Sequence, residues 1–405
     1  MPEINRDTLE IHGQQIFHWH LELSSKCALK CPRCPRTERP GQYKVTEMNL
    51  NLVKKILPPE RLSLAKKILL SGGQGDAIYC NDFLKIIRYF KETNPNIQLC
   101  ITTNGSYKKK DWWKEAAEIL QRNDIVIFSV DGWDQKSNEQ YRVGSHFQSI
   151  MEGLKTLRQF NKKVYIVWST IIFKFNQTHL NDIQNLAETM GVDSFNLVQS
   201  RLFGSVNPNY IDPNLGYDPL EPDKERIETS NTNRGCYINF TKRSSHHNIK
   251  PTIAQLMEKY RNTYQNSYIM PLCRIGERGL YVDAEGILYP CSWISHPFDI
   301  QASKTRNKTI SWEKSLFVEY KDSFNLNIHS LEDILQNPLW KKLQCSWQES
   351  KTAFVECEKH CHQSNSAKKI AGLQLKSFIK KDPALKTVDL YNKKLKEKVK
   401  EIKSF

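Results

Sequence analysis

Three cysteines near the start of the chain are spaced as a set of metal ligands. Cys27, Cys31 and Cys34 follow the pattern C-x3-C-x2-C within the stretch LSSKCALKCPRCPR. Three thiolates on one short loop can hold three irons of a [4Fe–4S] cube and leave the fourth iron without a protein ligand. An iron with an open position can bind a small molecule, so this loop is a candidate reaction centre.

A structural zinc site is the main alternative for these thiols. Zinc sites of that kind usually take four ligands, often as two C-x2-4-C pairs. This loop offers three cysteines and no fourth cysteine close by. A zinc ion shared with distant cysteines therefore stays open as the second interpretation.

The segments around the cysteine loop predict an α/β fold. Alternating or apolar runs predict strands at residues 17–23, 66–72, 97–105, 125–132, 164–173 and 194–199. Helical periodicity predicts helices at residues 81–94, 111–122, 147–160 and 178–190, the first with Asn81 as its N-cap. Strands that alternate with such helices form βαβ units on a parallel sheet. About six strands fit a partial (βα)6 TIM-like barrel, which carries its chemistry at the C-terminal ends of the strands.

The second predicted strand ends in a glycine-rich turn that suits a ligand. Gly72 and Gly73 allow backbone to approach a bound molecule closely. Gln74 and Asp76 follow these glycines with a neutral amide and a carboxylate. An ordinary strand-to-helix turn would also explain the glycines.

The cysteine spacing after a first strand resembles the radical S-adenosylmethionine (SAM) enzymes. The resemblance implies that the open iron chelates SAM, and that one electron cleaves it to a 5′-deoxyadenosyl radical, which takes a hydrogen atom from the substrate. The family usually has an aromatic residue just before the third cysteine, where this chain has Arg33. By position, the resemblance assigns SAM contacts to Gly72, Gly73, Gln74, Asp76, Thr103, Asn104, Ser129 and Asp131, and less directly to Asn176 and Arg201. Asn and Asp before glycine are also common turn formers.

A second group of cysteines lies in the C-terminal half. Cys273, Gly286 and Cys291 form the pattern C-x12-G-x4-C around a predicted β-hairpin. This pattern is similar to the opening of SPASM and twitch domains, which hold auxiliary Fe–S clusters in radical SAM enzymes. The resemblance implies one auxiliary [4Fe–4S] cluster, two clusters in all, with Cys273, Cys291, Cys357 and Cys361 as ligands and Cys345 or His362 as substitutes. Four thiolates in two pairs also suit zinc. The remaining cysteines, Cys80, Cys100 and Cys236, are expected to be small buried side chains.

Composition shifts and the resemblance together divide the chain into four regions: a core barrel at 1–204, an insertion or linker at 205–262, the auxiliary-cluster domain that the resemblance implies at 263–366 and a basic helical tail at 367–405. The linker is rich in Pro, Asn and Asp, and its Tyr210, Tyr217 and Tyr237 could face a substrate or fasten the loop. The tail has twelve lysines against four acidic residues, a net of +8 out of +15 for the chain. Such a tail suits an anionic partner, although it could also be a helix packed on the body with its lysines in solvent.

Composition also excludes several classes of protein. A hydrophobic content of 39% supports folded cores, no apolar run reaches the length of about 18 residues that spans a bilayer, and the first residues lack a secretory signal. Eleven cysteines without such a signal favour metal binding or catalysis in the reducing cytoplasm. The resemblance implies an electron donor such as flavodoxin or ferredoxin and a small-molecule, nucleotide or peptide substrate. The rival hypotheses are a zinc protein that binds nucleic acid without catalysis, and radical SAM modification of a peptide or nucleic acid.

Overall fold

The structure is a computed structural model that describes residues 10–11, 14–15, 18–41, 43–198, 200, 203–205, 208–223, 280–292, 294–295, 320–346 and 357. The chain divides into two compact units. The larger is Leu21–His246 with Asp283–Glu285, and the smaller is Met1–His20, His247–Val282 and Gly286–Phe405. Most of the predicted linker and the whole predicted tail lie outside the described residues.

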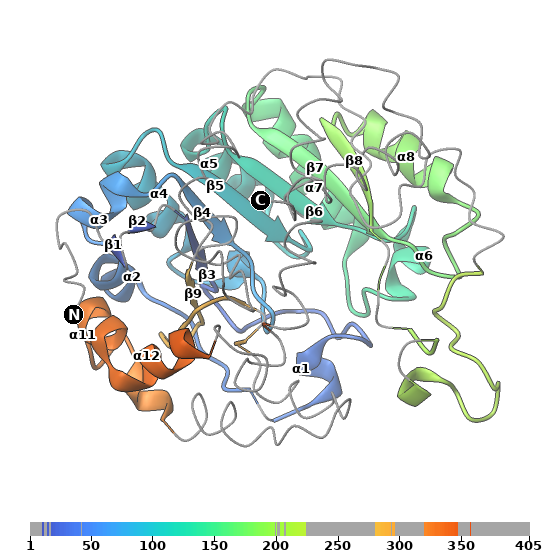
Figure 1. Cartoon of the computed structure of the whole chain (residues 1–405). Helices are drawn as coiled ribbons and strands as arrows, with labels where there is room; N and C mark the ends of the chain where they lie inside the picture. The colour runs from blue at the N-terminus through green and yellow to red at the C-terminus, as the bar shows by residue number, and fades with distance from the viewer. Residues whose placement is uncertain are drawn as a thin grey trace, which may run out of the picture. The chain divides into compact units, whose positions relative to one another are not determined.

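A parallel sheet forms the centre of the larger unit (Figure 1). Its strands are β4 (Lys67–Leu70), β5 (Gln98–Thr103), β6 (Ile125–Ser129), β7 (Tyr165–Ile171) and β8 (Ser194–Val198). Each pairs in parallel with the next. Strand β3 (His18–Leu21), which enters this unit at Leu21, precedes β4 in the sheet order. Six strands in chain order confirm the predicted α/β fold with a partial (βα)6 barrel.

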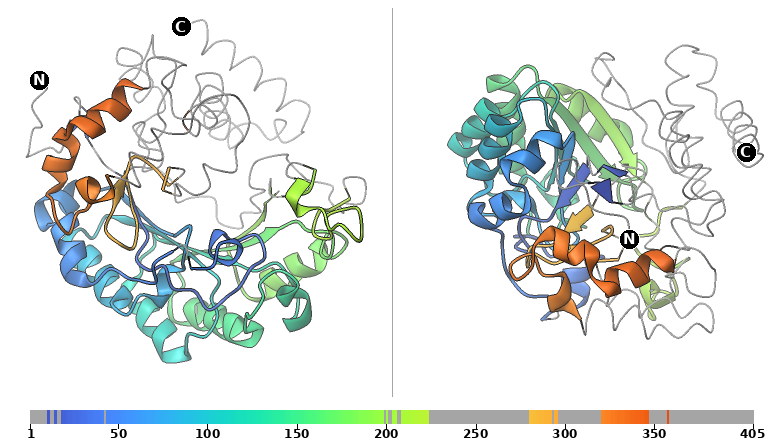
Figure 2. Two further views of the ribbon diagram at one scale, coloured as in Figure 1. Left: turned by 90° about the horizontal axis from the view of Figure 1, so that it is seen from below. Right: turned by 60° about the vertical axis from the view of Figure 1, so that its left-hand side comes forward.

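Four amphipathic helices cover the outer side of this sheet (Figure 2). They are α4 (Phe83–Thr93), α5 (Lys110–Ile119), α7 (Phe147–Phe160) and α8 (Leu180–Thr189), close to the predicted ranges. The predicted N-cap of the first is one residue off: Asp82 holds that position, and Asn81 instead bonds to Glu47 through its backbone N–H at 3.1 Å and its side-chain amide at 2.6 Å. Because Asn81 is hydrogen-bonded to the carboxylate of Glu47, it does not serve as the N-cap of α4.

The core lies between the helices and the sheet and is tightly packed. Trp113 of α5 is 2% exposed, and its ring lies 5.2 Å from that of Phe128 in β6. A Cβ atom on Gly153 of α7 would lie 2.5 Å from the indole nitrogen of Trp113. Glycine at this position thus lets α7 approach α5 closely. The predicted buried cysteines Cys80 and Cys100 are 2% and 7% exposed, which confirms that prediction, while Cys236 lies outside the described residues.

Several short elements escaped prediction because they are too short to show helical periodicity. They are α1 (Pro35–Glu38), α2 (Leu50–Ile56), α3 (Pro59–Leu64), α6 (Gln135–Glu139) and the 3₁₀ helices η1 (Ala77–Tyr79) and η2 (Pro208–Tyr210). They depend on local caps and on packing. Helix α2, for example, has Asn49 as its N-cap, and the side chain of Asn49 accepts a hydrogen bond from the N–H of Leu52 at 2.8 Å.

Replacing Asp134 with alanine is expected to lower the free energy of unfolding by about 1 kcal/mol at neutral pH. Asp134 caps α6 by accepting the N–H of Ser137 at 2.7 Å, and hydrogen bonding to the side chain and then the backbone of Ser137 holds the pKa of its carboxyl below the ordinary value. A lowered pKa stabilises the fold above the ordinary pKa of Asp and ceases to do so as the pH falls through the folded-state pKa. The difference between the two proteins in denaturant titrations should therefore shrink below about pH 4. A constant difference at all pH values would contradict this role.

The smaller unit contains the predicted C-terminal hairpin. Strands β9 (Leu280–Val282) and β10 (Leu288–Tyr289) pair antiparallel, with Gly286 in the turn at a φ of 85°. The unit also contains β1 (Glu10–Ile11), β2 (Gln14–Gln15), η5 (Lys321–Phe324), α11 (Leu331–Gln336) and α12 (Pro338–Cys345). Hydrogen bonding of the Leu326 N–H to the carbonyl of Gly286 ties the hairpin turn to the segment after η5. Within the described part of the chain, no helix has the length and apolar character needed to cross a bilayer.

Candidate functional site

The three N-terminal cysteines lie on the loop between β3 and α1. The N–H of Cys34 bonds to the carbonyl of Cys31 at 3.1 Å, and Cys34 is the N-cap residue of α1. Arg36 of α1 reaches back and donates to the carbonyls of Cys27 and Leu29 at 2.7 and 2.8 Å. A tight turn and one arginine thus fold the loop on itself and bring its three thiol-bearing residues together.

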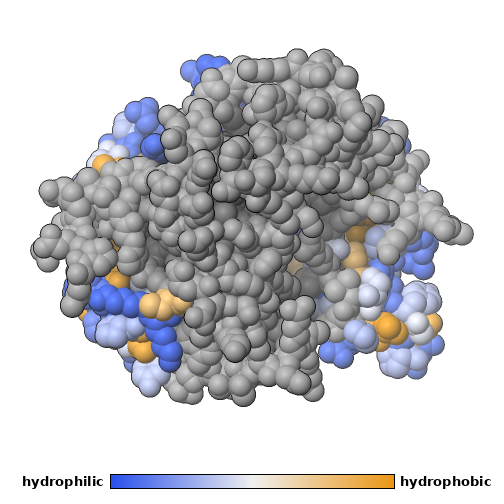
Figure 3. Space-filling model, in the orientation of Figure 1, coloured by the Kyte–Doolittle hydropathy of each residue, from blue (hydrophilic) through white to orange (hydrophobic). Residues whose placement is uncertain are grey.

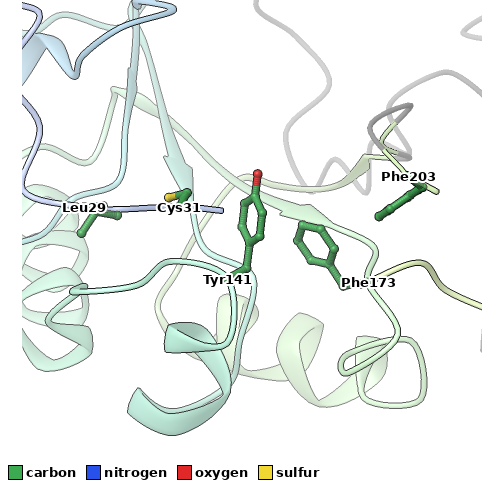
Figure 4. Close-up of a cluster of buried hydrophobic side chains, with 5 residues drawn as sticks. All are labelled: Leu29, Cys31, Tyr141, Phe173 and Phe203. Atoms are coloured by element: carbon green, nitrogen blue, oxygen red, sulfur yellow. The ribbon is translucent and has the colours of Figure 1, made fainter. Parts of the chain in front are cut away.

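These thiols share one apolar environment. Leu29, Cys31, Tyr141, Phe173 and Phe203 form a buried cluster (Figure 4). The half-buried Cys27 and Cys34 pack against it. The ring centroids of Tyr141 and Phe173 are 4.3 Å apart. Aromatic side chains from the β6–α7 and β7–α8 connections therefore form a buried apolar surface against the loop.

Burial makes two of these thiols, Cys27 and Cys31, weaker acids than ordinary cysteines because it raises their pKa. Burial first, and the nearby carboxylate of Asp76 second, raise the pKa of Cys27 to about 12. Burial also raises the pKa of Cys31, although the guanidinium of Arg142 opposes the shift. Bound iron would deprotonate thiols in such a place outright and neutralise their charge. The donor set and its low polarity therefore fit an Fe–S cluster. Among the described residues, no three His, Cys, Asp or Glu side chains converge as ligands of a single metal ion.

The glycine-rich turn after β4 is held by a buried glutamate. An oxygen of Glu22 accepts the backbone N–H groups of Gln74 and Gly75 at 2.7 and 2.9 Å, and Glu22 is 1% exposed. A Cβ atom on Gly72 would lie 2.1 Å from the same oxygen. Gly72 is therefore needed for this contact with Glu22, apart from any role that it has toward a ligand. Sequence reasoning missed Glu22, although an acidic residue between two apolar residues of a buried run was a usable signal.

Asp76 joins the turn to the end of β5. Its Oδ2 atom accepts from the hydroxyl of Thr103 at 3.0 Å and from the backbone and side-chain amides of Asn104 at 2.7 and 2.6 Å. Burial raises the pKa of Asp76 to about 6. The side-chain amide of Asn104 also lies 3.6 Å from the sulfur of Cys27. The structure thus brings three predicted site residues, Asp76, Thr103 and Asn104, into one network beside the first cysteine.

Asp131 joins the ends of β6 and β7. Its carboxylate accepts the N–H of Ile171 at 2.7 Å and pairs with Arg142 at 2.6 Å. Asn176 donates its amide to the carbonyls of Asp131 and Ile171 at 2.8 and 2.9 Å. Both residues therefore hold strand ends together. Arg142 was missed because it lies in the β6–α7 connection, away from any predicted strand end.

The other predicted residues differ in what surrounds them. Ser129 ends β6 with a half-buried side chain. Gly73 and the side chain of Gln74 are half-buried in the turn. In the second cysteine group, Cys291 follows β10 and is 8% exposed, Cys357 is 7% exposed and Cys345 is exposed at the end of α12. Arg201, Cys273, Cys361 and His362 lie outside the described residues, so the auxiliary ligand set stays a prediction.

The fold and this site define a partial (βα)6-barrel protein with a three-cysteine loop after its first strand. Residues 21–190, which are less than half of the chain, match the family model of the radical SAM superfamily.

Curated relatives match part of the chain at low identity. A cysteine-type anaerobic sulfatase-maturating enzyme of Clostridium novyi (strain NT) is 24% identical over 172 residues, which cover 40% of this chain and 44% of the relative. A probable GTP 3′,8-cyclase of Methanococcus maripaludis is 28% identical over 145 residues, covering 36% of this chain and 46% of the relative. The chain therefore spans less than half the length of either relative.

Solved structures match the chain at low identity and with TM-scores below 0.5. The chain resembles native anSMEcpe with bound AdoMet, with a TM-score of 0.45 and 12% identity over 82% of this chain and 84% of the other. It also resembles Streptococcus suis SuiB bound to the precursor peptide SuiA, with a TM-score of 0.47 and 14% identity over 82% and 67% of the two chains.

Proposed function

We propose that this protein is a radical SAM enzyme whose catalytic [4Fe–4S] cluster is held by Cys27, Cys31 and Cys34. The observation that carries the proposal is the position of these three thiols. They lie on one folded loop, against one apolar cluster, within a region that matches the superfamily. Three ligands leave one iron of a cube free of protein sulfur. When bound, the cluster supplies the electron that cleaves SAM to methionine and a 5′-deoxyadenosyl radical, which takes a hydrogen atom from the substrate.

The chain's own residues have positioning roles in this proposal. The turn from Gly72 to Asp76 and the strand-end residues Thr103, Asn104, Ser129 and Asp131 form the SAM site. Glu22 and Asp76 fix the turn and the end of β5 relative to the cysteine loop through hydrogen bonds of 2.6 to 3.0 Å. Rigid strand ends of this kind hold a cosubstrate in one orientation, which is the main contribution that a protein makes to radical chemistry. The buried apolar surface excludes water from the loop.

We further propose an auxiliary [4Fe–4S] cluster on Cys273, Cys291, Cys357 and Cys361. The burial of Cys291 and Cys357 supports ligand roles, because thiolate ligands of a structural cluster are normally shielded from solvent. A second cluster would take an electron from a substrate radical and so allow a net oxidation. An external donor such as flavodoxin or ferredoxin would then supply the first electron. The substrate is a small molecule, a nucleotide or a peptide, and deuterium transfer from each class into deoxyadenosine distinguishes the three.

Anaerobic reconstitution with iron and sulfide tests the proposal. We expect about eight irons per chain for two cubes and about four if only the first is present. Incubation with dithionite and SAM should release 5′-deoxyadenosine. Repeating the reaction with deuterated candidate pools of small molecules, nucleotides and peptides should transfer deuterium into deoxyadenosine from the true substrate class. A protein that holds its clusters but makes no deoxyadenosine would refute the proposal, and bound zinc in place of iron would favour the rival class.

A further inference from the structure

Arg33 connects the cysteine loop to a segment far along the chain. Its guanidinium pairs with the carboxylate of Asp218 at 2.8 Å, and the two side chains are 14% and 0% exposed. It also lies 3.9 Å from the centre of the Tyr210 ring. An arginine can make both contacts at once because its planar cation stacks on a ring while its edge donates to a carboxylate.

Asp218, the partner of Arg33, also binds the backbone of residues near it in the chain. Its two oxygens accept the backbone N–H groups of Leu220 and Gly204, each at 2.9 Å. A Cβ atom on Gly204 would lie 2.9 Å from the Cβ of Asp218, so the backbone passes very close to this side chain. The carboxylate thus organises two turns of the segment, and Arg33 provides a cation that compensates its buried charge.

The segment is also fixed to the β7–α8 connection. We call residues 203–205 and 208–223 the covering segment. The N–H of Lys174 bonds to the carbonyl of Leu220 at 3.1 Å, and the N–H of Asp223 bonds to the side chain of Gln177 at 2.8 Å. Phe203 belongs to the buried cluster that contains Cys31, and Leu220 packs against that cluster. The covering segment therefore contacts both the cysteine loop and the β7–α8 connection.

The outer surface of the covering segment carries both apolar and polar side chains. Ile211, Leu215 and Tyr217 are 39%, 50% and 48% exposed. Figure 3 shows apolar side chains among polar ones over the region around η2. Because these outward side chains are solvated, the covering segment is held in place by its inward contacts. These are the ion pair with Arg33 and the packing of Phe203 and Leu220.

We propose that Arg33 is a positioning residue that holds the covering segment against the cysteine loop and so shields the cluster from solvent and oxygen. This inference rests on the proposed function, because it requires a cluster at the three thiols. Loss of the guanidinium would leave Asp218 as an unpaired buried charge, and the covering segment would open more often. Oxygen would reach the cluster from that open state.

The test compares the rate at which reconstituted protein loses its visible cluster absorption in air. R33M should bleach about tenfold faster than the wild type or more, and R33K, which keeps the charge, should fall between them. Y210L, which leaves no buried charge unpaired, should bleach a few times faster. R88M is the matched control, because it breaks an exposed ion pair between Arg88 and Glu115 at 3.0 Å, and it should bleach at the wild-type rate.

Amide hydrogen exchange provides a second readout that separates positioning from general destabilisation. In R33M, exchange should rise in the covering segment and stay unchanged in α5 and α7. Wild-type rates of bleaching and exchange in both R33M and Y210L would overturn the inference. A wild-type protein that binds no iron would instead overturn the proposed function, so the two failures are distinct.

Discussion

Replacing Cys31 with alanine is expected to abolish SAM cleavage and to remove the catalytic cluster. Cys31 is the most buried of the three thiols, at 8% exposed, and lies within the apolar cluster beside Tyr141. Two thiolates cannot hold a cube that already has one open iron, because the remaining irons would depend on exchangeable ligands. We expect a loss of about four irons per chain and at least a thousandfold loss of deoxyadenosine formation, on the order of 4 kcal/mol in the barrier.

Cys100 offers the matched control for this experiment. It is also buried, at 7% exposed, but it lies within β5 and belongs to no predicted ligand set. C100A should cost about 1 kcal/mol of stability or less and keep the full iron content. If C31A retained its iron, or if C100A lost as much iron as C31A, the assignment of ligands to the loop would be wrong.

Replacing Gly75 with alanine is expected to displace the glycine turn and weaken SAM binding. A Cβ atom at this position would lie 2.1 Å from the carbonyl oxygen of Ser24 and 2.6 Å from the backbone of Ser25. Both obstacles are backbone atoms just before the cysteine loop, so no side-chain rotation can relieve the overlap. We expect the free energy of unfolding to fall by about 3 kcal/mol or more and the dissociation constant for SAM to rise at least about tenfold.

Gly41 separates the effect of this overlap from the general cost of an added methyl group. Gly41 has a φ of 79° and no atom within 4 Å of the position of a Cβ. G41A should therefore cost only the roughly 1–2 kcal/mol of a strained left-handed residue and leave SAM binding unchanged. Denaturant titration and calorimetric SAM binding measure both quantities. Equal SAM affinities of G75A and the wild type would show that the turn lies apart from the SAM site.

Much of the barrel was predictable because its elements are local patterns. Helix α7 spans the predicted residues 147–160, and Phe83, Ile86, Ile87 and Phe90 form the predicted buried face of α4. The cysteine loop was predictable for the same reason, since its three thiols lie within eight residues. These features depend on spacing along the chain, which a sequence displays directly.

The contacts that complete the site were not predictable because they join distant residues. Glu22 and Gln74 are 52 positions apart, and Arg33 and Asp218 are 185 apart. No local pattern marks such a pair, and Arg33 looked like a departure from the family rather than one half of an ion pair. The same limit applied to the contact of Arg33 with Tyr210, which also joins residues far apart in the chain.

The separation between Arg33 and Asp218 also sets an order of events during synthesis. A ribosome that adds roughly 5–20 residues per second needs about 10 to 40 seconds to cover the 185 positions that separate Asp218 from Arg33. The cysteines therefore leave the ribosome well before the covering segment is synthesised. We expect iron delivery to be easiest in that interval, when the carriers that load metal into new chains still have access to the loop.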